Sequence, residues 1–205
     1  MSSAQYDDQP LLSAVWPVRS NPALRGLVLA VLGVIAMTVA AKVKVPYIPV
    51  PVTLQTLVLP LIAAAYGPRL GALTALAYLG AGLAGLPVFT NTPPAVPGPL
   101  YFLGATGGYL LAYPVAAWVI GWLAGGRQSS LFRLIGAMLA GEAIVLAAGF
   151  LWLAFGAQIA GGSGIGASAA FFAGIAPFLL PDLLKVALAA CVLRASWAFV
   201  QPPQM

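Results

Sequence analysis

Asp182 and Lys185 lie near the C-terminal end, inside an otherwise apolar stretch, and are the first candidates for chemistry. Their i, i+3 spacing places both side chains on one face of a helix. The pair could be structural, two charges that neutralise each other so that the helix can lie in lipid. It could instead be a polar handle, in which the carboxylate accepts and the ammonium donates hydrogen bonds to a ligand. An ionisable group inside a membrane span is a functional candidate by default. We favour the handle, because the pair is expected beneath a long outer loop, on a helix that starts with Pro181.

Thr53 and Gln55 are the second pair of candidates. They follow the segment PYIPVPV (residues 46–52), which contains three prolines and therefore cannot continue a helix. Both residues then enter an apolar helical stretch. Polar side chains under a rigid loop, at the start of an apolar segment, indicate a small-molecule site at a membrane surface.

Glu142 lies near the middle of another apolar segment, residues 131–157. It could relay protons, but no other acid or histidine lies along a plausible path. We interpret it as a structural residue that bonds a neighbouring helix or a backbone amide.

Two glycine-rich stretches carry weaker signals. GATGGY (104–109) opens an apolar segment and is either a tight turn into a helix or a helix N-terminus whose free amides receive a polar group. GGSGIGAS (161–168) resembles a phosphate-binding loop but has Ala167 where lysine is needed, so we exclude a nucleotide site.

The composition identifies the kind of protein that carries these residues. Of 205 residues, 61% are hydrophobic and 6% charged, and the mean hydropathy is +0.99. Soluble domains contain about 25% charged residues. The chain is therefore predicted to be an all-α integral membrane protein. It has no histidine and a single cysteine, Cys191, which argues against a metal centre, a haem or a serine–histidine triad. We expect no catalytic residues and no enzyme activity.

Six apolar segments are long enough to be helical, and we expect six transmembrane helices. The second is expected to be interrupted by Pro60, and the sixth to begin near Pro181 as a first helical turn. Small residues in the first (Gly26, Ala30, Ala36 and Ala40) favour close helix packing. The expected spans are 26–41, 53–66, 70–86, 109–124, 131–157 and 181–197.

The basic residues orient these spans, since lysine and arginine favour the cytoplasmic side. Both termini are expected inside, with residues 1–22 a disordered cytoplasmic tail and residues 23–205 a single membrane domain. Lys42 and Lys44 are the exceptions, at the outer end of the first span. The cytoplasmic set is Arg19, Arg25, Arg69, Arg127, Arg133 and Arg194.

Three blocks of the sequence resemble the signature blocks of the BioY family. They begin VPVTLQTLVLP (50–60), GATGGYL (104–110) and PFLLPDLLK (177–185), and they occur in the family's order. Ala105 stands where the family usually has proline, and Leu180–Asp182 reads LPD where PGD is common. BioY proteins are the biotin-binding S components of energy-coupling-factor (ECF) transporters.

The resemblance implies an S-component fold in the bacterial cytoplasmic membrane that holds biotin near the outer surface. Biotin would be the transported ligand, with no cofactor, and ATP would bind only to the partner ATPase subunits. The small face of Ala36 and Ala40 would dock against the transmembrane coupling subunit. The implied biotin-binding residues are Thr53, Gln55, Tyr78, Phe89, Thr106, Tyr109, Asp182 and Lys185.

Two alternatives remain at this point. An S component for another vitamin would share the fold, and a proton-coupled secondary transporter would depend on Glu142 and Asp182. An enzyme acting on lipids would need a clustered catalytic set that the sequence lacks.

Overall fold

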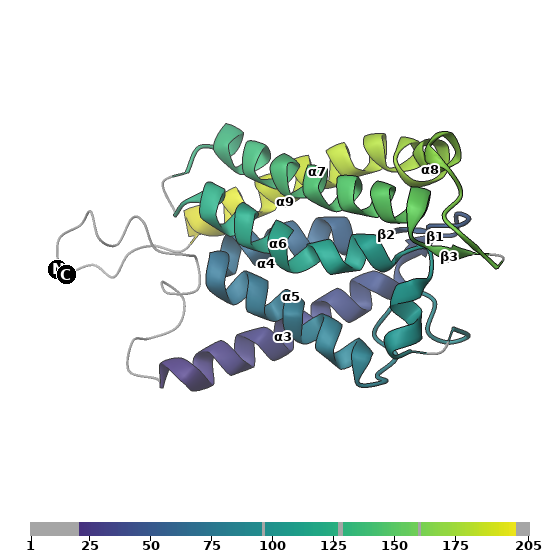
Figure 1. Ribbon diagram of the computed structural model, residues 1–205. Helices are drawn as coiled ribbons and strands as arrows, with labels where there is room; N and C mark the ends of the chain where they lie inside the picture. Colours follow the sequence, from purple (N-terminus) through teal and green to yellow (C-terminus); the bar gives the residue numbers. More distant parts are fainter. Residues whose placement is uncertain (1–20, 96, 127–128, 160, 200–205) are drawn as a thin grey trace, which may run out of the picture.

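The structure is a computed structural model that describes residues 21–95, 97–126, 129–159 and 161–199 (Figure 1). Most of the predicted tail, including Arg19, lies outside the described residues, as does Arg127. Two antiparallel hairpins, β1 (Lys44–Val45) with β2 (Val52–Thr53) and β3 (Gln158–Ile159) with β4 (Gly162–Ser163), accompany the helices. The helices are α3 (Pro22–Lys42), α4 (Gln55–Tyr66), α5 (Pro68–Leu83), the 3₁₀ helix η1 (Pro99–Leu103), α6 (Gly107–Ala124), α7 (Leu131–Phe155), α8 (Ala167–Gly174) and α9 (Ala176–Phe199).

The long helices lie side by side, with α7 and α9 at the top of Figure 1, α4 and α6 in the middle, and α3 and α5 at the bottom. Helix α6 contacts α4, α5 and α7, and α4 also contacts α9. The chain reverses direction from α3 to α4 and at each later connection between long helices. Both hairpins, η1 and α8 therefore gather at one end of the bundle, on the right of Figure 1. We call it the hairpin end.

Four helical stretches of the described part are long and apolar enough to cross a membrane: Pro22–Lys42, Gly107–Ala124, Leu131–Phe155 and Ala167–Trp197. These correspond to the expected first, fourth, fifth and sixth spans. The second expected span forms α4, a shorter apolar helix of 12 residues, and the third forms α5, of 16 residues.

Two expectations about proline were wrong. Pro60 does not interrupt α4, and Pro181 does not begin the last helix, because α9 already begins at Ala176. A proline removes one backbone hydrogen bond, yet apolar helical segments on both of its sides keep the helix continuous where neighbouring helices pack against it. Asp182 and Lys185 therefore lie in the second and third turns of α9 instead of its first.

Close packing of α3 depends on a glycine that the predicted small-residue face did not include. A Cβ atom on Gly33 would collide with the Thr74 side chain of α5, and it would meet the Tyr66 ring at 3.5 Å. By contrast, a Cβ on Gly26 would meet nothing within 4 Å. Gly33 thus lies at a close contact between α3 and α5.

Candidate ligand-binding site

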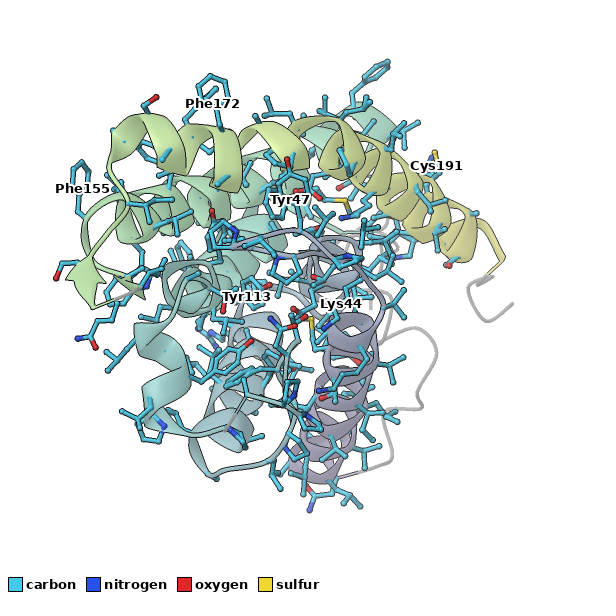
Figure 2. All side chains as sticks on the ribbon, turned by 90° about the vertical axis from the view of Figure 1, so that its right-hand side faces the viewer. Lys44, Tyr47, Tyr113, Phe155, Phe172 and Cys191 are labelled. Carbon is cyan, nitrogen blue, oxygen red and sulfur yellow. The ribbon has the colours of Figure 1, made fainter. Side chains whose placement is uncertain are left out.

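A pocket opens near the hairpin end, between α4, α6, α7 and α9. Four of the eight predicted binding residues line it: Thr53, Gln55, Thr106 and Tyr109. Figure 2 views the molecule from this end, with Tyr113 deep among the helices and Lys44 and Tyr47 on the hairpin segment. The full lining is Val50, Pro51, Thr53, Gln55, Thr56, Thr90, Tyr101, Thr106, Tyr109, Leu110, Tyr113, Glu142, Val145, Leu146 and Phe178.

Gln55 forms the polar floor at the first turn of α4. Its backbone N–H donates to the Thr53 hydroxyl at 3.3 Å, which ties the helix start to strand β2. The Gln55 side-chain amide donates to the Tyr78 hydroxyl at 2.9 Å, and Tyr78 donates in turn to the Val88 carbonyl at 3.0 Å. Since Gln55 is 3% exposed, these bonds fix how its amide faces the pocket.

Tyr78 and Phe89 were predicted to pack on a ligand ring, but they lie outside the lining of this pocket. Both side chains are fully buried behind its wall. Phe89 stacks on Tyr101 with 4.7 Å between ring centroids, and it meets Tyr78 edge to face at 5.5 Å. Their role in this structure is to support Gln55 and Tyr101, which do line the pocket.

Tyr101 and Thr106 form the rim on the side of η1. The Tyr101 hydroxyl is hydrogen-bonded to Thr106, and burial raises the pKa of Tyr101, so the phenol stays neutral at physiological pH. Thr106 immediately precedes α6, which begins at Gly107. The GATGGY stretch therefore places the Thr106 side chain in the pocket lining, directly before the first residue of α6.

The Tyr109 side chain extends from α6 to the point where α8 ends and α9 begins. Its hydroxyl donates to the Gly174 carbonyl at 2.8 Å, and its ring stacks on Phe178 with 6.1 Å between centroids. A Cβ atom on Gly149 of α7, or on Gly174, would collide with the Tyr109 side chain. Two glycines thus make the space in which this aromatic wall of the pocket fits.

Asp182 and Lys185 form an ion pair at 2.8 Å, and both side chains are also hydrogen-bonded to Thr56 of α4. The Lys185 ammonium also donates to the Thr56 hydroxyl at 2.9 Å and to the Thr53 carbonyl at 2.8 Å. Thr56 donates to the Asp182 carboxylate at 2.7 Å. All three N–H groups of the Lys185 ammonium are therefore bonded within the protein. Neither Asp182 nor Lys185 lines the pocket, and both contact Thr56, which does.

Glu142 of α7 completes this group. Its carboxyl group lies next to that of Asp182 on α9, and its structural role stays a prediction. Glu142 Oε1 and Asp182 Oδ2 have no protein donor. We call Thr56, Glu142, Asp182 and Lys185 the polar cluster; Thr56 and Glu142 line the pocket.

Several lining residues were not predicted: Thr56, Thr90, Tyr101, Tyr113, Glu142 and Phe178. One had a usable signal: Tyr113 lies four positions after Tyr109 in α6, a spacing that shares a helix face. Thr90 and Tyr101 come from the link between α5 and α6, and helical periodicity does not locate such residues.

Ala36 and Ala40, the predicted docking residues, do not share one surface. Ala36 is exposed on α3, whereas Ala40 is 2% exposed. The Ala40 carbonyl accepts a hydrogen bond from the Leu54 backbone, which places it under the hairpin segment. The AxxxA pattern therefore describes one outward and one inward residue.

Comparison with known proteins identifies the family. The family model described as "BioY family" matches residues 12–202. The chain belongs to the BioY family. BioY relatives include the "Probable biotin transporter BioY" of Pyrococcus horikoshii, 34% identical, over 80% of this chain and 91% of that protein. A protein of the same name in Rickettsia prowazekii is 31% identical over 84% of each chain.

A solved structure shares the fold. It is described as the S-component for biotin from an ECF-type ABC transporter, and it matches with a TM-score of 0.71 and 22% identity. The match covers 87% of this chain and 94% of that one. The predicted S-component fold is confirmed in its architecture, in a multi-pass membrane protein.

Proposed function

We propose that this protein captures biotin outside the cytoplasmic membrane, as the substrate-binding subunit of an ECF-type transporter. The observation that carries the proposal is the pocket at the hairpin end, where polar groups face aromatic side chains. Membership of a family whose relatives are named biotin transporters supports it. The protein is then a transport subunit and not an enzyme, and it needs no cofactor of its own.

The pocket offers groups that suit each part of biotin. The ureido ring donates through two N–H groups and accepts through a carbonyl, and the Glu142 carboxyl group offers acceptors for those N–H groups at one side of the pocket. Tyr109 and Phe178 offer faces for the apolar thiophane ring. Thr106 and Gln55 remain for other polar atoms. Asp182 and Lys185 hold Thr56 and Glu142 in place.

We further propose six spans with both termini inside, the hairpin end being the outer one. Arg25, Arg69 and Arg133 lie in the first turns of α3, α5 and α7, which all start at the opposite end of the bundle, and Arg194 lies near the end of α9. A helix of 12 residues is about 18 Å long, short of the roughly 30 Å hydrocarbon core. Helix α4 would therefore start below the outer surface, which leaves depth for the pocket above it.

Partner subunits supply the energy in this proposal: a transmembrane coupling subunit and cytoplasmic ATPases. The exposed face of α3 that includes Ala36 is the proposed docking surface, without Ala40. A proton-coupled transporter is the competing function, because Glu142 and Asp182 are two buried carboxyl groups that lie next to each other. Two observations weigh against it: Lys185 forms an ion pair with Asp182, and the cluster is tied to α4 by Thr56.

Uptake of labelled biotin distinguishes the two. We expect vesicles that contain this chain with a coupling subunit and ATPases to accumulate biotin when ATP is supplied on the cytoplasmic side. Collapsing the proton gradient should leave the rate unchanged. Uptake driven by an imposed proton gradient without ATP would overturn the proposal in favour of the proton-coupled transporter.

A further inference from the structure

The orientation rule leaves two cations at the hairpin end unexplained: Lys42, the last residue of α3, and Lys44 in β1. The Lys42 ammonium donates to the Phe89 carbonyl at 2.6 Å and to the hydroxyl of Thr92 at 3.2 Å, and it also contacts the Thr92 carbonyl. An ammonium has three donors and no acceptor. Lys42 thus fills a site in which three oxygen atoms of one short loop converge.

That loop, residues 88–92, follows the end of α5. The Phe89 carbonyl also accepts from the Thr92 backbone N–H at 3.2 Å, so the Lys42 ammonium adds a donor to a hydrogen-bonded turn. The Thr92 hydroxyl donates to the Phe89 carbonyl at 2.7 Å, and Thr92 is 2% exposed. The Thr90 hydroxyl donates to the Ala41 carbonyl at 2.5 Å. Two successive residues of α3, Ala41 and Lys42, therefore hold the loop from one side.

The same loop forms the pocket wall. Thr90 lines the pocket directly. Phe89 supports Tyr101 by ring stacking, and Tyr101 lines the pocket as well. The Val88 carbonyl accepts the Tyr78 hydroxyl that in turn orients Gln55. Lys42 itself is not part of the lining, so it acts on the pocket through the loop.

We propose that Lys42 is a positioning residue for ligand binding: it fixes the loop 88–92 and through it Thr90 and Tyr101. The expected effect on biotin binding rests on the proposed function. The expected effect on how firmly the loop is held does not. The lysine's position at the outer end follows from this contact, since its charge is matched by loop oxygens.

Lys44 is the matched control. It carries the same charge two residues further on, but its ammonium bonds the Asn91 side chain at 2.6 Å and reaches the Thr90 carbonyl only at 3.3 Å. Lys44→Met removes the same charge and leaves the Phe89 and Thr92 carbonyls paired. Lys42→Arg is the conservative variant.

The first experiment measures the dissociation constant for labelled biotin with the purified full chain. We expect Lys42→Met to weaken binding about tenfold, Lys42→Arg to restore part of it, and Lys44→Met to stay within about twofold. If Lys42 acts through Thr90, adding Thr90→Val to Lys42→Met should weaken binding less than it does in the wild-type background. Full additivity, or Lys42→Met binding like wild type, would overturn the proposal.

The second experiment needs no ligand. A Thr90→Cys variant in a Cys191→Ser background reports how firmly the loop is held, through its rate of reaction with a small thiol reagent. We expect Lys42→Met to raise that rate about tenfold, and Lys44→Met to leave it nearly unchanged. Equal rates in all backgrounds would refute the positioning role. A chain that binds no biotin but shows the rate increase would refute only the biotin function.

Discussion

Glu142 of α7 and Asp182 of α9 lie next to each other inside the helix bundle, 7% and 2% exposed, and one carboxyl oxygen of each has no hydrogen-bond partner in the described part of the protein. Two buried carboxyl groups with one balancing lysine make a cluster whose net charge is zero when it holds one proton. Such a cluster is tolerated in a membrane span, and it leaves Glu142 facing the pocket. The first two predictions follow from this relationship.

Glu142→Gln should fold as well as wild type, because the glutamine amide keeps an acceptor oxygen and adds N–H donors that can reach Asp182. Glu142→Ala removes the pocket-facing group, and we expect it to weaken biotin binding by about tenfold or more, since a hydrogen bond to a charged cluster contributes about 1.5–3 kcal/mol. Titration with labelled biotin measures both. Wild-type affinity in Glu142→Ala would remove Glu142 from the site.

Asp182→Asn and Lys185→Met should each lower thermal stability, because a single change leaves the partner charge unpaired in an apolar setting. If the cluster also positions Thr56 and Glu142 for the ligand, biotin binding should fall as well. The double variant separates the two roles. A double variant that is stable and binds biotin at wild-type strength would show that the pair is only structural.

Gly149→Ala tests the aromatic wall. Its added methyl group would collide with the Tyr109 ring, so we expect loss of the Tyr109–Gly174 hydrogen bond and about tenfold weaker binding of biotin. The control is Gly136→Ala on the same helix, where a Cβ would meet nothing within 4 Å. That variant should gain about 0.5–1 kcal/mol of stability and keep its affinity. Equal affinities for the two variants would contradict the role assigned to Tyr109.

Ala36→Leu and Ala40→Leu should differ. Ala36 is exposed, so its replacement should leave biotin binding intact and weaken assembly with the coupling subunit, measured by co-purification. Ala40 is buried, so its replacement should reduce the yield of folded protein by overpacking. Loss of binding and assembly together in Ala36→Leu would show that this face packs inside the protein.

Thiol labelling in intact cells tests the orientation. In a Cys191→Ser background, a cysteine at Asn91 should react with a membrane-impermeant reagent, and one at Arg69 should be protected. The reverse pattern would invert the topology, and would place the pocket on the cytoplasmic side.

The sequence predicted the helices better than the site. Long apolar runs located α3, α6 and α7 within a few residues of their observed ends. The expectations for Pro60 and Pro181 were wrong, because neighbouring helices decide whether a proline ends a membrane helix. The polar cluster joins side chains from α4, α7 and α9, and no local pattern says which helices are neighbours. For the same reason the sequence did not indicate that Tyr78 and Phe89 lie outside the pocket lining, in contact with Gln55 and Tyr101.

Lys42 illustrates the remaining gap. In the sequence it was an exception to the charge rule, while the structure shows its ammonium on oxygens of a loop 47–50 residues away. Contacts at that separation depend on the folding of the loop, which contains no periodic signal.

Equilibrium binding of labelled biotin to the purified chain tests the central claim most directly. The account predicts saturable binding at one site per chain, displaced by unlabelled biotin, unaffected by an excess of thiamine or riboflavin, and weakened in Glu142→Ala. Binding that is absent from folded protein, or equally displaced by the other vitamins, would contradict it.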